Sequence, residues 1–152
     1  MKINKLNLNK KIGNPNRPDD VLAFVGKGVC FDSGGLNLKK TGGIEDMWFD
    51  KGGACTVLSA FKAAVELNLP INLACSLAFV ENLTGSDCYH PSDIIKSYKG
   101  LTVEIGNTDA EGRLILADAM SYVQEKHKPN TLIEFSTLTG AVMVSLVINR
   151  IR

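Results

Sequence analysis

Residues 21–35 read VLAFVGKGVCFDSGG, and this stretch indicates the fold class. Its first part, Val21 to Val25, is a continuous apolar run of the kind found in strands that are buried on both faces of a sheet. Four glycines follow between residues 26 and 35, so we expect the chain to leave this strand into a tight loop. Lys27 and Asp32 would lie in that loop, beyond the end of the strand.

Helical and strand patterns alternate along the rest of the chain. The expected elements are a helix over 52–69, a strand over 71–80, a hairpin turn within 97–105, a helix over 110–126 and a strand over 131–135. Strands that alternate with helices predict an α/β domain, with a mostly parallel or mixed sheet flanked by helices.

The two ends of the chain have a different character from its middle. Residues 1–20 are rich in Asn, Lys, Pro and Asp, which predicts a lead-in segment and leaves 21–152 as the domain. Residues 141–152 are mostly apolar and look like the start of an element that is cut short.

Composition and charge exclude several classes of protein. With 45% hydrophobic and 22% charged residues and a net charge of +1, the chain has the balance of a soluble globular protein and no basic excess for nucleic acid. Its apolar runs are too short to span a membrane. The N-terminus lacks the apolar region of a secretory signal, and the four cysteines form no C-x-x-C pair, which together predict a cytoplasmic protein with reduced thiols.

Three polar clusters fall where the predicted strands and helices meet. VGKGVCFDSGG carries Lys27 and Asp32, DMWFDKGG carries Asp50, and NTDAEGRL carries Asp109 and Glu111. In sheets of this type ligands bind beyond the carboxyl ends of the strands, and clustered carboxylates repel one another unless a cation or a proton lies between them. A divalent metal is the simplest solution, and Asp109 and Glu111, in an extended turn before a helix, can converge on one cation.

A structural interpretation of the same residues stays open at this point. Acidic side chains in the first turn of a helix stabilise it without any function, so Asp50 and Asp109 are each candidates for simple helix caps. Three separate segments would then need unrelated reasons for their acidic residues. Phosphate binding is a weak alternative, because VGKG lacks the spacing and the Ser or Thr of a P-loop.

The same segments carry a resemblance to a known family. VGKGVCFDSGG, LNLK, MWFDKGGA, NTDAEGRL and STLTGA, in this order and spacing, resemble the leucyl (cytosol) aminopeptidase family of dinuclear metallopeptidases. The resemblance covers roughly residues 20–143 and corresponds to the N-terminal part of that family's catalytic domain. It implies an α/β domain that is incomplete relative to the family's catalytic domain, with 21–152 as a partial aminopeptidase catalytic domain.

The resemblance also implies roles for individual residues. Five match the family's metal ligands: Lys27, Asp32, Asp50, Asp109 and Glu111. Asp32 and Glu111 would bridge two divalent ions, Zn²⁺ or Mn²⁺. Lys39 matches the catalytic lysine that stabilises the oxyanion, and Arg113 matches the arginine that holds a bicarbonate ion as general base. Four residues match positions that line the substrate site: Met47, Thr137, Leu138 and Gly140.

The function implied is metal-dependent hydrolysis of N-terminal, leucine-like residues from peptides with a free N-terminus, by a protease that forms homo-oligomers, hexamers in the family. The alternative is a truncated, non-catalytic remnant that binds metal weakly or associates with a full-length relative. The chain departs from the family's usual pattern at two places: Lys51 stands where methionine is common, and His90-Pro91-Ser92-Asp93 stands where Arg-Pro-Gly-Asp is usual. A local loop change is expected around Ser92.

Overall fold

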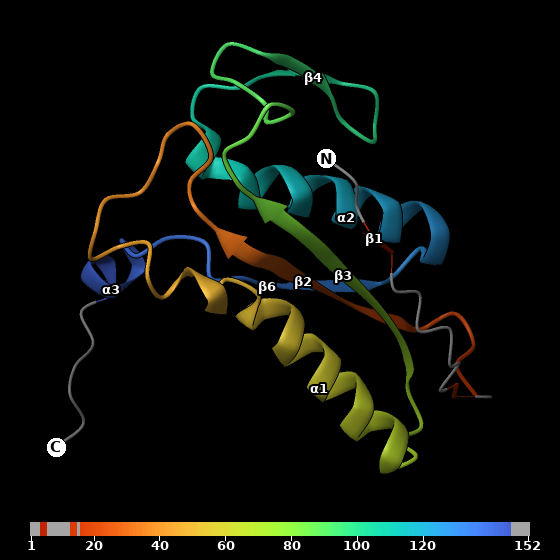
Figure 1. Ribbon diagram of the computed structural model, residues 1–152. Coiled ribbons are helices and arrows are strands. Elements are labelled where there is room, and N and C mark those ends of the chain that lie inside the picture. Colours follow the sequence, from red (N-terminus) through yellow and green to blue (C-terminus); the bar gives the residue numbers. More distant parts are fainter. Residues whose placement is uncertain (1–3, 6–12, 15, 147–152) are drawn as a thin grey trace, which may run out of the picture.

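The structure, a computed structural model, describes residues 4–5, 13–14 and 16–146. Most of the predicted lead-in segment and the last six residues of the predicted cut-short element therefore lie outside the described part of the chain. A central four-stranded sheet has the order β1-β3-β2-β6 (Figure 1). Its strands are β1 (Asn4–Lys5), β2 (Val21–Asp32), β3 (Asn72–Asn82) and β6 (Thr131–Phe135).

The sheet is mixed and mostly parallel, as the sequence predicts. β2 runs parallel to both β3 and β6, whereas β1 is antiparallel to β3. A separate antiparallel hairpin consists of β4 (Ile94–Lys96) and β5 (Thr102–Glu104). The predicted turn at Lys99 and Gly100 connects these two strands, with Gly100 at a φ of +86°.

Two long helices cover opposite faces of the sheet. These are α1 (Gly52–Glu66) and α2 (Glu111–His127), and Figure 1 shows the sheet between them. Along β2, Ala23, Val25 and Val29 are buried in a cluster with α2 residues, while Leu77 of β3 packs with Ala54 and Val57 of α1. Because successive side chains of a strand point to opposite faces of the sheet, the strands contribute apolar side chains to the core on both faces.

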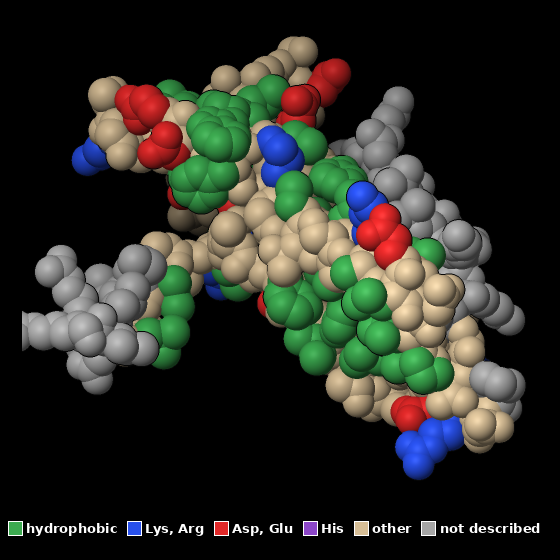
Figure 2. Space-filling view, turned by 90° about the horizontal axis from the view of Figure 1, so that it is seen from below, with side chains coloured by type: hydrophobic (Ala, Val, Ile, Leu, Met, Phe, Trp, Pro, Cys, Tyr) green, Lys and Arg blue, Asp and Glu red, His purple; other side chains and the backbone are tan. Residues whose placement is uncertain are grey.

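Short elements complete the described chain. Two 3₁₀ turns precede the helices, η1 (Met47–Phe49) before α1 and η2 (Thr108–Ala110) before α2, and a short helix, α3 (Val142–Ser145), follows β6. Lys62 and Glu66 are the only charged residues of α1. Figure 2 shows hydrophobic side chains gathered on the surface of the molecule on the α1 side. No helix in the described ranges is long and apolar enough to cross a membrane.

The prediction of a tight loop after Val25 is wrong, because β2 continues through Gly26 and Gly28 to Asp32. A Cβ at Gly26 would lie 2.6 Å from the Cα of Ala54, and one at Gly28 would lie 2.8 Å from Cδ1 of Phe79. These glycines let neighbouring elements approach closely and do not make a turn. The turn comes later, at Gly34 and Gly35, where φ is +88° and +64°.

Candidate metal centre

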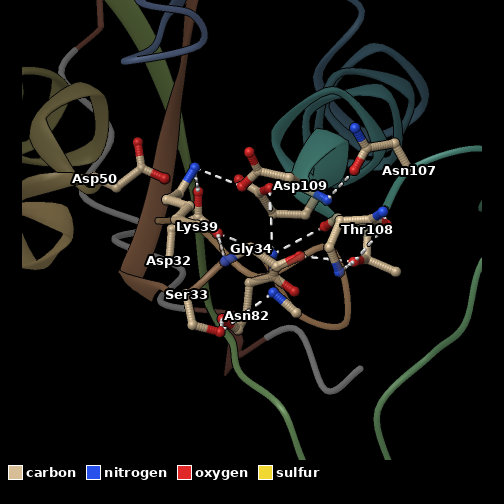
Figure 3. Close-up of polar contacts among 12 residues, drawn as sticks. Asp32, Ser33, Gly34, Lys39, Asp50, Asn82, Asn107, Thr108 and Asp109 are labelled. Atoms are coloured by element: carbon tan, nitrogen blue, oxygen red, sulfur yellow. Dashed lines mark hydrogen bonds and ion pairs between the residues drawn. The ribbon is translucent and has the colours of Figure 1, made fainter. Parts of the chain in front are cut away.

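The candidate site lies at the carboxyl ends of β2 and β3, where both long helices begin. Asp32 is the last residue of β2 and pairs in register with Asn82, the last residue of β3. Glu111 is the first residue of α2, and Asp50 lies two residues before α1. Because parallel strands end at the same edge of a sheet, four distant parts of the sequence meet here (Figure 3).

Three carboxylates converge in this region. Asp32, Asp109 and Glu111 each present an oxygen within 4.8 Å of the others. Asp32 and Glu111 are almost fully buried, with 3% and 1% of their surface exposed. Burial raises the pKa of Glu111, since the attraction of Lys27 lowers it by less and the charge of Asp32 raises it further. The carboxylates are therefore held together against their own repulsion.

Two lysines lie between the carboxylates. The Lys27 ammonium is 2.8 Å from Oδ2 of Asp50 and 3.1 Å from Oε1 of Glu111. The Lys39 ammonium is 3.0 Å from Oδ2 of Asp32 and 2.5 Å from Oδ1 of Asp109. Partial burial lowers the pKa of Lys39, but its hydrogen bonds and ion pairs with Asp109 and Asp32 together outweigh this effect and raise it.

The charges and donor atoms at this site fit divalent cations. Four carboxylates against two ammonium groups leave two negative charges in a mostly buried cluster. Three buried carboxylate oxygens, Oδ2 of Asp50, Oδ1 of Asp109 and Oε1 of Glu111, have an ion-pair contact to a lysine but no well-formed hydrogen bond. Carboxylate oxygens are the ligands that hard divalent ions prefer, so these three are candidate ligand atoms.

The helix-cap interpretation of Asp50 and Asp109 does not hold in this structure. Asn107 is the residue that caps η2, because its side chain accepts a hydrogen bond from the backbone N–H of Asp109 at 2.8 Å. The cap residue of α1 is Lys51, and Asp50 instead accepts hydrogen bonds from Lys27 and Thr137, at 2.9 and 2.6 Å. Neither aspartate is therefore a capping residue, although Asp109 lies in the first turn of η2.

The local geometry differs from the prediction in two respects. Lys27 comes from the interior of β2 and not from a loop, with its ammonium under the first turn of α2. A Cβ at Gly112 would lie 2.7 Å from Cε of Lys27, so a larger residue there would force the end of the lysine side chain to shift. Asp109 and Glu111 are joined by a 3₁₀ turn that leads into α2, and the backbone is extended only before it, at Asn107.

Sequence reasoning missed the polar residues that hold the loops of the site together. Thr108 is fully buried, and its hydroxyl donates to the carbonyl of Gly34 at 2.6 Å. The carbonyl of Thr108 accepts hydrogen bonds from Asn82 at 2.9 Å and from Tyr89 at 2.6 Å. The available signal was an asparagine two residues after an apolar strand run, at the end of a strand where ligands bind.

The structure brings some of the remaining predicted residues to the cluster and not others. Thr137 joins it through Asp50 and through a carbonyl that accepts from Lys27 at 3.2 Å, and Leu138 lies beside Gly112. Arg113 is exposed, and its side chain makes no hydrogen bond or ion pair with any other described residue. Two residues are not brought into polar contact with the carboxylates within the described ranges: Met47 and Gly140.

The two departures from the family's usual pattern also have structural consequences. The Lys51 ammonium donates to the backbone carbonyls of Cys30, at 3.2 Å, and of Trp48, and has no carboxylate partner among the residues described. It is therefore occupied by backbone groups. Ser92 has a φ of +72°, in the left-handed region that favours glycine.

Fold and site together define an α/β protein with a buried carboxylate and lysine cluster at the carboxyl ends of parallel strands. Residues 8–149 match the catalytic domain of the cytosol aminopeptidase family. A probable cytosol aminopeptidase of Alcanivorax borkumensis is 50% identical over 125 residues, which cover 82% of this chain and 26% of that protein. One of Xylella fastidiosa is 53% identical over 123 residues, which cover 81% of this chain and 25% of that protein. The chain belongs to the cytosol aminopeptidase family.

Solved structures agree with this assignment. Caenorhabditis elegans leucine aminopeptidase matches with a TM-score of 0.81 and 45% identity over 83% of this chain and 26% of that one. The bottromycin maturation enzyme BotP in complex with Mn matches with a TM-score of 0.76 and 37% identity over 85% of this chain and 29% of that one. The chain thus spans about a quarter of the length of the relatives that it matches.

Proposed function

We propose that this chain forms the metal-binding part of an aminopeptidase that removes N-terminal, leucine-like residues from peptides. The observation that carries the proposal is the convergence of Asp32, Asp109 and Glu111 on one buried point, flanked by Lys27 and Lys39. Family membership supports the class of reaction, and the location of the cluster at the carboxyl ends of the strands supports its use as a ligand site.

Five residues would hold two divalent ions, Zn²⁺ or Mn²⁺: Lys27, Asp32, Asp50, Asp109 and Glu111. When bound, the ions would supply the Lewis-acid chemistry of peptide hydrolysis. Lys27 is nearly buried and contacts Asp50 and Glu111, so its Nζ is placed beside the carboxylates that would hold the ions. A Mn complex of BotP is consistent with a metal site in this fold.

Two side chains of the chain would act directly on the substrate. Lys39 lies at the rim of the cluster, with 18% of its side chain exposed, where its ammonium can stabilise the oxyanion that forms at the scissile carbonyl. Arg113 has an exposed guanidinium without a carboxylate partner in the described chain, and such a group can grip a small planar anion such as bicarbonate as general base.

The substrate would lie against the segment that follows β6. Thr137 already contacts Asp50, and Leu138 is 42% exposed, so this segment offers a polar backbone and an apolar side chain beside the cluster. Gly140 and Met47 would complete the substrate site. We further propose that residues 21–152 are part of a larger catalytic domain, that the whole protein forms a homo-oligomer, and that it works in the cytoplasm, as the names of its relatives suggest.

A second candidate function is that of a non-catalytic remnant that associates with a full-length relative. It is favoured by the outer edge of β6, which has no strand partner within the described residues. An open strand edge and an apolar helix face are surfaces that another polypeptide can cover.

Hydrolysis of a leucine anilide by the purified chain separates the two candidates. We expect activity that requires added Mn²⁺ or Zn²⁺ and that is lost in Glu111→Gln, because the substitution removes a carboxylate from the centre of the cluster. A sizing column run on the same sample shows whether the protein is an assembly. Folded protein without metal-dependent activity would contradict the catalytic proposal for this chain and favour the remnant.

A further inference from the structure

Asn82 lies between the buried carboxylates of Asp32 and Glu111. It is the last residue of β3 and only 3% of its surface is exposed. Its amide nitrogen donates to Oδ1 of Asp32 at 2.8 Å, to the carbonyl of Thr108 at 2.9 Å and, more weakly, to Oε2 of Glu111 at 3.4 Å. All three neighbours are acceptors, so the amide must present its nitrogen to them.

The hydrogen bonds of Asn82 divide each carboxylate into two functionally different oxygens. In Asp32, Oδ1 is held by Asn82 and by the backbone N–H of Gly34, while Oδ2 contacts Lys39. In Glu111, Oε2 is next to Asn82, while Oε1 contacts Lys27. One oxygen of each carboxylate is therefore anchored, and the other is turned toward a cation.

Asn82 is itself fixed, so it can impose an orientation on its partners. Its backbone carbonyl accepts hydrogen bonds from both the backbone N–H and the hydroxyl of Ser33, each at 2.8 Å. Its bond to Thr108 connects it to the turn that carries Asp109. A single neutral amide at the end of β3 thus connects the end of β2 with the start of α2. These two segments carry the carboxylates of Asp32 and Glu111, which repel each other.

We propose that Asn82 is a positioning residue that orients Asp32 and Glu111 for divalent-metal binding, an inference that rests on the proposed function. Without its donor, the two carboxylates would lose their common anchor and could turn away from each other. Groups that orient metal ligands through hydrogen bonds typically contribute about 10- to 100-fold to metal affinity.

The test is calorimetric titration of the full chain with Mn²⁺ or Zn²⁺, in the unsubstituted protein and in Asn82→Ala. We expect the dissociation constant to rise about 10- to 100-fold in Asn82→Ala. The matched control is Asn72→Ala, at the opposite end of the same strand. The side chain of Asn72 also makes three hydrogen bonds, with Asn14, Arg17 and Asp20, and they lie far from the carboxylates along β3.

The control separates a positioning role from a purely structural one. Both variants lose an amide that connects chain segments, so both should be less stable, but only Asn82→Ala should bind metal more weakly. Metal affinity within about twofold of the unsubstituted chain in Asn82→Ala would overturn the inference, as would an equal loss in Asn72→Ala. If Asn82→Ala fails to fold, Asn82→Ser replaces it, and its shorter hydroxyl should still leave affinity reduced at least about threefold.

Failure of this inference is distinguishable from failure of the proposed function. Unchanged metal binding in folded Asn82→Ala contradicts the role of Asn82 and leaves the metal site standing. Absence of metal binding in the unsubstituted chain contradicts the metal site itself, and the role of Asn82 with it.

Discussion

A substitution at Gly53 tests the packing that holds α1 and Asp50 in place. An ideal Cβ at Gly53 would lie 2.0 Å from the backbone carbonyl oxygen of Phe135, and 3.1 Å from the backbone nitrogen of Lys27. The first distance is more than 1 Å shorter than an ordinary contact. Because both neighbours are backbone atoms of the sheet, α1 itself must move in Gly53→Ala.

The expected cost follows from two opposing effects. Overpacking that a core absorbs costs typically about 1–3 kcal/mol, and a clash with backbone belongs at or above the upper end of that range. Alanine in place of glycine in a helix returns about 0.5–1 kcal/mol. We therefore expect Gly53→Ala to lose about 2 kcal/mol or more, which at this chain length corresponds to a fall of roughly 4–8 °C in the melting temperature.

Gly52 provides a control one residue away. Its Cβ would meet only the end of the Thr137 side chain, at 3.3 Å, so Gly52→Ala should be neutral or slightly stabilising. The assay is thermal and urea denaturation of both variants, followed by circular dichroism. If Gly53→Ala were as stable as Gly52→Ala, the close approach of α1 to β6 would be refuted, and with it this explanation of the glycine.

Three further predictions concern the backbone, a thiol and the pH dependence of stability. Ser92→Gly should raise the free energy of unfolding by about 0.5–1 kcal/mol in urea denaturation, because Ser92 has a φ of +72° and a left-handed conformation costs a side chain about 1–2 kcal/mol. Unchanged stability would argue against strain there. Burial raises the pKa of Cys75 to about 12, so at pH 8 an alkylating reagent followed by mass spectrometry should modify exposed Cys55 and spare Cys75 until the protein unfolds. Burial also raises the pKa of Glu111, so in the metal-free chain its contribution to stability is present below the unfolded pKa and lost as pH rises through the folded pKa. Urea denaturation in a chelator should therefore show stability falling above about pH 4.5 from this group, and Glu111→Gln should flatten that fall.

Much of the fold was predictable because it depends on local patterns. The two helices, the strand that became β6 and the hairpin turn at Gly100 agree with apolar periodicity and turn residues. The error at Gly26 and Gly28 has a physical origin. A glycine needed for a turn and a glycine needed for close packing look the same in a sequence, and only the neighbouring helix distinguishes them.

The candidate site was predictable as a set of residues but not as an arrangement. Motif order indicated which carboxylates and lysines belong together, and the structure brings Asp32, Asp109 and Glu111 within reach of one another. Asn82 and Thr108 were missed, since a neutral polar residue carries no charge signal, and its importance comes from the three segments that it connects.

The class of fold and the residue types of the candidate site could be predicted from the sequence alone, because alternating apolar patterns and unbroken motifs are local properties of the chain. The balance of charges at the site depends instead on the tertiary structure. Lys27 pairs with Asp50 and Glu111, Lys39 pairs with Asp32 and Asp109, and Lys51 binds backbone carbonyls instead. The pairings between lysines and carboxylates join residues from 7 to 84 positions apart in the sequence. They form only when the parallel strands bring their carboxyl ends to one edge of the sheet.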